Sequence, residues 1–285
     1  MLSRRSFVLT SLSTLSVAAL VGCGGTPAAT DDSAEPAADA TGTGAVDTGK
    51  LIVGFDSSYP PYGYQGDDGE YTGFDLELAQ EVAARNDWEV QLEPINWDAK
   101  DTMLDSGAIN CIWNGFTMEG REEDYTFSEP YMINGQVIVV RADSGIASFD
   151  DLAGKNVITQ VDSAAYNLFE GEDATQAELA ATFGSLETIG DYNTAFTQLE
   201  SGASDAVACD LSIAAYQLAA RPDLFLQLDE FLSEEHYAVG FKKGDDATAD
   251  VVNETLRAMD ADGFVQELCD KYAEDGISYD NWCLE

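Results

Sequence analysis

Apolar and polar positions alternate with two different periods in the first part of the chain. Residues 51–55 form a short continuous apolar run, which is typical of a buried strand. Apolar residues recur every four positions over 73–87, so an amphipathic helix is predicted there. A strand over 89–95, a short helix over 98–106 and a strand over 108–113 follow. Strands that alternate with helices predict parallel sheets built from crossover connections.

The second part of the chain repeats this order. We predict a strand over 155–159, a helix from Ala164, a strand over 182–189, a helix from Asn193 and a strand over 205–209. The chain therefore carries two sets of alternating elements.

A shift of 95 residues places 97–108 over 192–203 with matching aromatic, Leu and acid-Ser-Gly-Ala positions. Chance similarity of two helix-strand units is the alternative explanation. We interpret the match as two α/β lobes of similar topology, each a mostly parallel sheet flanked by helices and joined by two hinge crossings. The first lobe is predicted to comprise 50–135 plus 239–285, and the second 136–238.

Ligands of open parallel sheets bind beyond the carboxyl ends of the strands. The two equivalent strand ends carry Asn114-Gly115-Phe116-Thr117 and Cys209-Asp210, and Arg121 lies close to the first. If the lobes face each other, a cation and an anion line one cleft. That arrangement suits a zwitterion, and the plainest zwitterion is a free amino acid.

Residues 1–22 are predicted to be a signal peptide rather than part of the fold. A basic pair, Arg4-Arg5, precedes an apolar stretch too short to span a membrane comfortably. Leu20-Val21-Gly22-Cys23 resembles a bacterial lipobox, which implies a lipid on Cys23; an ordinary signal peptide with an incidental cysteine is the alternative. The amino-terminal segment also resembles a twin-arginine export signal. Residues 24–49 are small or acidic and are predicted to be a flexible linker.

Charge and cysteine content exclude several classes of function. The formal net charge is −40, from 53 acidic and 13 basic residues, which argues against nucleic-acid binding. No transmembrane helix is expected after Cys23, so the chain is not predicted to be a permease. With one histidine and no CxxC motif, neither a metal site nor a cofactor is expected. Cys269 and Cys283 are a possible disulfide, with two free thiols as the alternative.

A set of ordered landmarks gives a specific resemblance. Over Lys50 to Tyr272 the chain resembles the amino-acid-binding lipoproteins of ABC importers, in the polar amino acid (family 3) solute-binding group with the type II periplasmic binding protein fold. Each landmark alone is weak, and seven in order at fitting spacing are specific. They are Val53-Gly54-Phe55-Asp56-Ser57-Ser58-Tyr59-Pro60-Pro61-Tyr62, Gly73-Phe74-Asp75-Leu76-Glu77-Leu78-Ala79, Trp97-Asp98, Asn114-Gly115-Phe116-Thr117 with Arg121, Phe127-Ser128-Glu129-Pro130-Tyr131, Asp151-Leu152-Ala153-Gly154-Lys155 and Ala261-Asp262-Gly263.

The resemblance implies roles for individual residues. Arg121 would bind the ligand α-carboxylate, and Thr117, Gly115 and Asp210 would hold the α-ammonium. Ser163 would reach the carboxylate. The loop before Arg121 is one residue shorter than is usual in the family, and Gly120 offers the backbone freedom to accommodate this. The remaining implied pocket residues are Asp56, Tyr59, Asn114, Phe116 and Trp97.

Each of these residues also has a structural interpretation. Arg121 lies among acidic residues and would then be part of a surface charge cluster, and Asp210 would be a strand-end turn residue. Asp56 would cap a turn, and Tyr59 and Trp97 would be core aromatics.

The function implied is hinged capture of a free polar amino acid outside the cytoplasm. The lobes close on the ligand, and the closed form docks on an ABC permease whose ATPase drives import. A lipid on Cys23 would hold the protein, expected to be a monomer, at the outer face of the cytoplasmic membrane. The alternatives are a cleft enzyme of the same fold, resembling cyclohexadienyl or arogenate dehydratases, and a chemosensory binding protein.

Overall fold

The structure of the chain is a computed structural model that describes residues 49–171 and 174–284. The predicted signal peptide, the predicted lipidation site Cys23 and, except for Gly49, the predicted linker lie outside the described residues. No helix in the described part is both long and apolar enough to cross a bilayer.

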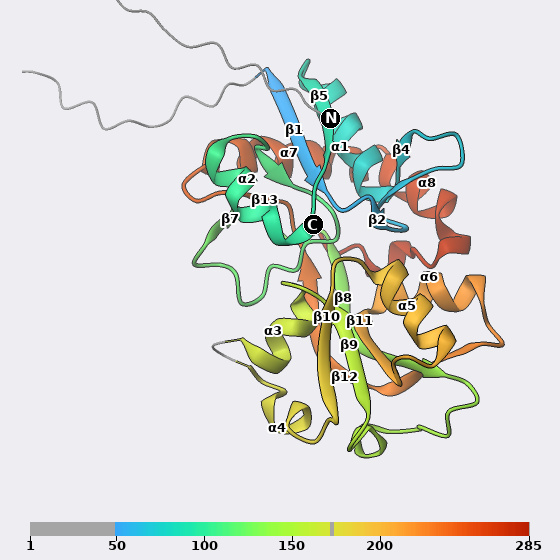
Figure 1. The fold of residues 1–285 in the computed structure, drawn as a ribbon. Helices are drawn as coiled ribbons and strands as arrows, with labels where there is room; N and C mark the ends of the chain where they lie inside the picture. Colours follow the sequence, from blue (N-terminus) through green and yellow to red (C-terminus); the bar gives the residue numbers. More distant parts are fainter. Residues whose placement is uncertain (1–48, 172–173, 285) are drawn as a thin grey trace, which may run out of the picture. The chain divides into compact units, whose positions relative to one another are not determined.

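The first sheet has five strands in the order β5-β1-β6-β13-β7 (Figure 1). β1 pairs in parallel with β5 and β6, whereas β13 is antiparallel to both β6 and β7. Four strands therefore point one way, and β13 is the reversed one. The strands are β1 (Lys50–Phe55), β5 (Glu89–Pro94), β6 (Cys111–Ile112), β7 (Tyr125–Phe127) and β13 (Gly240–Lys242).

The second sheet has the order β10-β9-β11-β8-β12. β9 is parallel to β10 and β11, and β8 is antiparallel to β11 and β12, so β8 is the reversed strand. The strands are β8 (Met132–Arg141), β9 (Asn156–Gln160), β10 (Ser185–Ile189), β11 (Ala206–Asp210) and β12 (Phe225–Tyr237). A third, small sheet beside the first is formed by β2 (Ser58–Tyr59), β3 (Gly63–Gln65) and β4 (Tyr71–Thr72).

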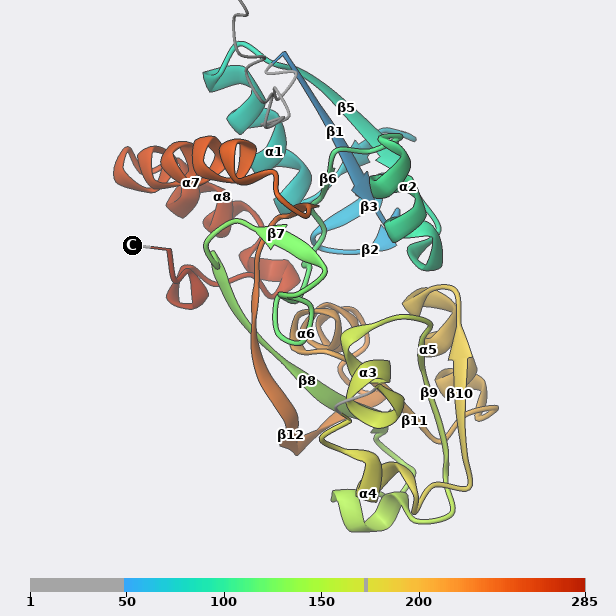
Figure 2. The same ribbon diagram turned by 90° about the vertical axis from the view of Figure 1, so that its left-hand side faces the viewer.

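The two large sheets have equivalent topologies, strand for strand. The edge strand of each leads directly into the reversed strand of the other: β7 precedes β8, and β12 precedes β13. Figure 2 shows the long strands β8 and β12 running together from the first sheet into the second. The predicted α/β class with two similar, mostly parallel sheets is confirmed. The residues at which the predicted lobes divide stay a prediction.

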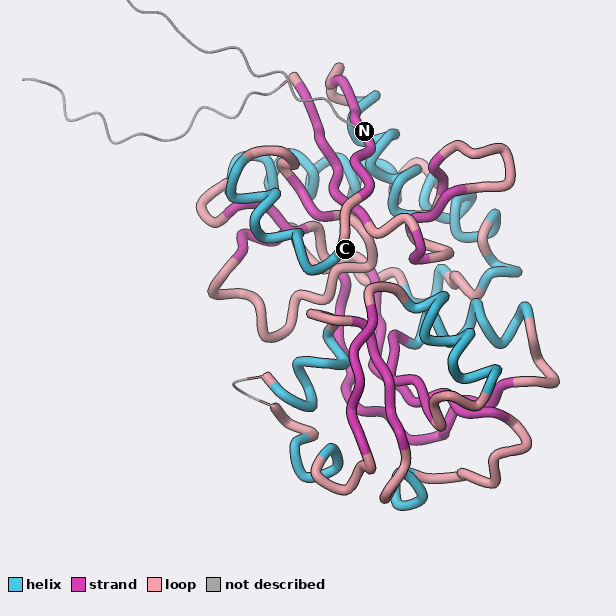
Figure 3. The backbone as a smooth tube through the Cα atoms, viewed as in Figure 1, coloured by secondary structure: helices cyan, strands magenta, loops and turns pink. Residues whose placement is uncertain are grey.

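Helices surround both sheets (Figure 3). α1 packs on β1 and β5, and the carboxyl-terminal helix α7 packs against α1. One cluster of buried apolar side chains contains residues of both sheets, among them Val53, Phe241, Val137 and Val207. The helices are α1 (Phe74–Arg85), α2 (Lys100–Ser106), α3 (Ala164–Glu170), α4 (Ala177–Ala180), α5 (Tyr192–Ser201), α6 (Leu211–Ala220), α7 (Asp246–Ala261) and α8 (Phe264–Lys271), with 3-10 turns η1 (Trp97–Ala99), η2 (Phe149–Leu152), η3 (Ala273–Asp275) and η4 (Tyr279–Asn281).

The internal repeat corresponds to α2–β6 in one sheet and α5–β11 in the other. Both helices end at a left-handed glycine, Gly107 with φ 76° and ψ 16° and Gly202 with φ 75° and ψ 17°. β6 is shorter than predicted, because the N–H groups of Ala108 and Ile109 donate back to the Met103 carbonyl and so close the helix instead of pairing with β1.

The four cysteines in the described part are free. Cys283 Sγ lies 3.6 Å from the Pro130 carbonyl oxygen, to which it donates, and Cys269 is buried in α8. The possible disulfide between them is therefore absent from the structure. Cys111 and Cys209 are buried in β6 and β11, as expected of small core residues.

Candidate functional site

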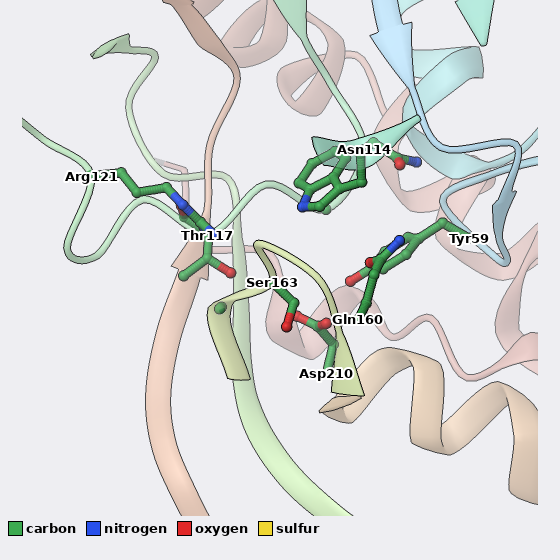
Figure 4. Close-up of a pocket in the computed structure, with 10 residues that line it drawn as sticks. Tyr59, Asn114, Thr117, Arg121, Gln160, Ser163 and Asp210 are labelled. Carbon is green, nitrogen blue, oxygen red and sulfur yellow. The ribbon is translucent and has the colours of Figure 1, made fainter. Parts of the chain in front are cut away.

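A pocket lies where the carboxyl ends of β6, β9 and β11 meet. Figure 4 shows side chains from both sheets converging on it. Eight of the ten predicted ligand residues line it, and Asp56 and Phe116 do not. The lining residues are Tyr59, Trp97, Asn114, Gly115, Thr117, Arg121, Gln160, Ser163, Ala164 and Asp210.

Arg121 is buried, with 6% of its surface exposed, and does not belong to a surface charge cluster. Its guanidinium lies over the Phe116 ring at 4.9 Å, so Phe116 supports the arginine from behind the pocket wall. Nη1 donates to the Thr117 carbonyl at 2.9 Å and Nη2 to the Asp162 carbonyl at 3.2 Å. A guanidinium has five N–H donors, so Arg121 keeps donors for a carboxylate. Gly120, at φ 77°, provides the left-handed turn that the short loop requires.

Asp162, in the turn that follows β9, receives three contacts from the other side of the pocket. Its carbonyl oxygen accepts from Arg121 and from Trp97 Nε1 at 3.2 Å, and its carboxylate lies 3.7 Å from Lys100 Nζ. Burial lowers the pKa of Lys100, which the charge of Asp101 partly offsets. These contacts hold the two sides of the pocket together.

Asp210, at the end of β11, is buried and accepts three hydrogen bonds on Oδ1. The donors are Gln136 Nε2 at 2.7 Å, Tyr237 OH at 3.0 Å and Asn134 Nδ2 at 3.1 Å. Burial raises the pKa of Asp210, and the hydrogen bonds oppose this shift. Asp210 is thus a rigidly held carboxylate on the pocket wall, suited to an ammonium group.

Glu235 of β12 is a second buried carboxylate beside Asp210 that the sequence analysis did not find. Its Oε1 accepts from Asn134 at 2.7 Å, Gln136 at 2.8 Å and Thr117 Oγ1 at 2.9 Å. Burial raises the pKa of Glu235 to about 7, and the charge of Asp210 adds to this shift. Thr117 thereby connects the pocket to this carboxylate.

Asp56 and Gln160 connect the first sheet to the second at the other end of the pocket. Gln160 Nε2 donates to Asp56 Oδ2 at 2.6 Å, and Asn114 Oδ1 accepts from the Asp56 amide at 2.9 Å. Burial raises the pKa of Asp56, and the hydrogen bonds from Ser58 and Gln160 oppose the shift. Asp56 lies behind Gln160, and Gln160 forms the pocket wall.

Ser163 lines the pocket, but its hydroxyl is already engaged. It caps α3 by accepting from Tyr166 N at 3.1 Å and lies 3.1 Å from Thr159 Oγ1. Because the Thr159 hydroxyl donates to the Ala208 carbonyl, the Ser163 hydroxyl is left to donate to Thr159. A ligand would have to compete with Thr159 for this proton.

Tyr59 and Gly115 shape the remaining wall. Tyr59 is buried, and its hydroxyl lies 3.3 Å from that of Tyr237. Gly115 has φ 57°, and a Cβ there would lie 3.0 Å from the Tyr59 ring and 3.1 Å from the Tyr237 ring. Its amide donates to the buried carboxylate of Asp75 at 2.5 Å. A glycine is thus required both by the backbone conformation and by the close packing.

Gln160 and Ala164 are pocket residues that the sequence analysis missed. Gln160 ends β9, so the strand-end rule that selected Asn114 and Asp210 also applies to it. Among the described residues, no group of three or more histidine, cysteine or acidic side chains is arranged to hold a metal ion.

Comparison with known proteins gives consistent matches. Residues 51–275 match the family model of bacterial extracellular solute-binding proteins, family 3. The L-cystine-binding protein TcyJ of Escherichia coli K12 is 32% identical over 227 residues, which cover 79% of this chain and 82% of TcyJ.

Solved structures match as well. A substrate-binding protein of an ABC uptake transporter from Streptococcus pneumoniae, solved with bound histidine, is 31% identical with a TM-score of 0.76 over 81% of this chain and 94% of that one. An ancestral amino-acid-binding protein, a precursor of cyclohexadienyl dehydratase, is 30% identical with a TM-score of 0.70 over 79% and 95% of the two chains.

Proposed function

The chain belongs to the bacterial extracellular solute-binding proteins of family 3, and we propose on this basis that it binds a free polar amino acid in the pocket described above and delivers it to an ABC importer. The observation that carries the proposal is the presence of Arg121 and Asp210 in one pocket. A buried guanidinium with unused donors suits the α-carboxylate, and a buried carboxylate suits the α-ammonium.

The cellular setting is part of the same proposal. The Streptococcus pneumoniae relative is named a component of an ABC uptake transporter, which supports a permease and its ATPase as partners. A lipid on Cys23 and a linker to residue 49 keep the monomeric protein at the outer face of the cytoplasmic membrane. The tether raises its effective concentration near the permease.

The ligand is a polar or cationic amino acid rather than glutamate. Named relatives bind cystine, arginine and glutamine. Lys100 near the site already forms ion pairs with Asp101 and Asp162. Apart from Arg121, the charged side chains of the site that form no ion pair among the described residues are all carboxylates: Asp56, Asp210 and Glu235. A second ligand carboxylate that has no ammonium of its own, as in glutamate, would meet this negative charge without a matching cation. Glutamine, histidine, arginine, lysine and cystine are the candidates.

Binding rather than catalysis is supported by the named relatives, which are binding proteins. The ancestral neighbour connected with a dehydratase is itself named an amino-acid-binding protein. An enzyme of this fold would convert prephenate or arogenate. We expect neither phenylpyruvate nor phenylalanine to form from them.

The proposal is tested by thermal shift against the twenty amino acids, cystine and ornithine, on protein that has been unfolded and refolded to remove bound ligand. One or a few α-amino acids are expected to raise the melting temperature at concentrations above their dissociation constants. Arg121→Lys keeps the charge but loses the planar fork, so the shift is expected to fall sharply.

Arg221→Lys is the matched control, because Arg221 pairs with Glu200 on the surface and does not line the pocket. It is expected to keep the full ligand response. No response of the native protein to any amino acid, or an equal loss in both variants, would contradict the proposal.

A further inference from the structure

Asp210 and Glu235 share the same two hydrogen-bond donors. Gln136 Nε2 lies 2.7 Å from Asp210 Oδ1 and 2.8 Å from Glu235 Oε1, and Asn134 Nδ2 lies 3.1 and 2.7 Å from the same two oxygens. Two amide nitrogens therefore bridge the carboxylates, which fixes these oxygens close to each other. Each carboxylate has one further donor of its own, Tyr237 or Thr117.

The pair is buried, and no cation of the described residues forms an ion pair with it. Asp210 is 4% exposed and Glu235 is 3% exposed. No ion pair of the described residues involves either of them. Arg121 is the guanidinium in the same pocket, and its hydrogen bonds go to the carbonyls of Thr117 and Asp162.

The phenols and the thiol that surround the pair are neutral. Burial raises the pKa of each of them, so they carry no charge near pH 7 that would compensate a carboxylate. They are the phenols of Tyr59, Tyr62, Tyr192 and Tyr237 and the thiol of Cys209.

Two carboxylates that share donors in a buried site do not both ionise without a compensating cation. The two side-chain amides, the Thr117 hydroxyl and the Tyr237 hydroxyl stabilise one negative charge. A second negative charge would be disfavoured by its loss of solvation and by repulsion from the first. A proton on one carboxyl, or a cation at Asp210, removes this conflict.

We propose that Asp210 and Glu235 form one proton-sharing pair and that the ammonium group of the ligand replaces the shared proton, which leaves for solvent. This rests on the proposed function and deepens it, because Glu235 then favours ligands that carry a positive charge at Asp210. Glu235 acts through Thr117 and Asp210 and is a positioning residue.

The proposal has a quantitative consequence. Burial raises the pKa of Glu235 to about 7, so near neutral pH the pair carries the extra proton in a fraction of the molecules. Binding of an ammonium then releases less than one proton per ligand, and affinity rises with pH between 6 and 8 by at most tenfold per unit. A 2-hydroxy acid with the same side chain lacks the ammonium and is expected to release no proton.

The experiment is titration calorimetry at pH 7 in two buffers with different ionisation enthalpies. The probe is L-glutamine, L-arginine or L-cystine, whichever the thermal-shift panel shows to bind. The native protein is expected to release a measurable fraction of a proton. Glu235→Gln is expected to abolish the release and to make the affinity independent of pH from 6 to 8, and Glu235→Asp is expected to restore both.

Three further variants test whether a group other than the pair is the source of the proton. His236 is the single histidine of the chain and forms a contact of 2.7 Å with Glu119, partly exposed to solvent. His236→Gln and Glu119→Gln are expected to keep the proton release. Asp75→Asn tests another buried carboxyl near the pocket, which contacts Gly115.

The inference is overturned if the native protein binds without proton release, if Glu235→Gln releases protons as before, or if only His236→Gln or Asp75→Asn abolishes the release. A separate readout does not need a ligand: the infrared band of a protonated carboxyl at pH 6 is expected to weaken in Glu235→Gln. An unchanged band overturns the shared proton, whereas failure of every amino acid to bind overturns the proposed function.

Discussion

The side-chain amide of Gln160 donates to the carboxylate of Asp56 over 2.6 Å. Gln160 ends β9 and Asp56 follows β1, so the bond joins equivalent strand ends of the two sheets. Together with the contacts to Asp162 on the opposite side of the pocket, it connects the two sides of the pocket. Contacts between its two sides thus flank the pocket at both ends.

Gln160→Ala removes the bond to Asp56 and is expected to weaken ligand binding. A hydrogen bond to a charged group contributes about 1.5–3 kcal/mol, which corresponds to a loss of roughly ten- to a hundredfold in affinity. Calorimetry with the identified amino acid measures it. Gln91→Ala, which removes a contact to Glu93 on β5, is the control and is expected to bind normally. Equal affinities of the two variants would show that the Asp56 contact does not stabilise the closed form.

Asp56→Asn is expected to weaken the binding of arginine far more than that of glutamine, because it removes a negative charge behind Gln160. Dissociation constants of both ligands for both proteins provide the measurement. A similar loss for the two ligands would exclude Asp56 from recognition of the side chain.

Gly115→Ala is expected to abolish ligand binding, since the new Cβ would lie 3.0 Å from the Tyr59 ring at a position that also requires φ 57°. Gly154→Ala is the matched control: φ is 71° there, but no heavy atom lies within 4 Å of the added Cβ. Both variants are expected to lose about 1–2 kcal/mol of stability from the left-handed backbone. If binding weakened equally in both, backbone strain rather than packing in the pocket would be the cause.

Asp75 makes folding depend on pH. Burial raises its pKa from 3.8 to about 7, against the hydrogen bond from Gly115. Between these values the folded protein holds a proton that the unfolded chain has lost, so its stability falls as pH rises, by up to ~1.4 kcal/mol per unit. Urea unfolding at pH 5 and pH 8 is expected to show the native protein losing stability relative to Asp75→Asn. A constant difference between the two proteins would contradict this assignment.

Salt is expected to stabilise the fold. With 53 acidic and 13 basic residues, the folded chain repels itself, and the screening length falls from about 8 Å at 0.15 M to about 3 Å at 1 M ionic strength. The melting temperature should rise by several degrees between 0.05 and 1 M NaCl. Sodium chloride should have a larger effect than an uncharged osmolyte that gives the same osmotic pressure; equal effects would exclude electrostatic screening.

The alternation of elements was sufficient to predict the fold, because each crossover helix carries its own apolar pattern and ends at a glycine such as Gly107 or Gly202. The strand-end rule was also sufficient to place Asn114 and Asp210 on one pocket. The sequence analysis missed Gln160 because the strand-end rule was not applied to β9.

Glu235 and Lys100 depend on tertiary packing and leave no local signal. Glu235 lies in the polar stretch from Ser233 to His236, whose composition is typical of a solvent-exposed segment. Its side chain is directed inward because the register of β12 against β8 is irregular between Phe231 and Ser233. Lys100 begins a short helix and is buried, with its ammonium 3.7 Å from the carboxylate of Asp162 in the turn after β9.

The exchange of strands between the sheets also fixes the order in which the fold is completed. β12 ends at Tyr237, so the second sheet has all its strands before β13 at Gly240–Lys242 has been synthesised. Until then β6 and β7 have no strand between them. The first sheet, which contains β1, is thus completed after the second. A chain that stops at Tyr237 would have every strand of the second sheet but would lack the strand that joins β6 to β7 in the first.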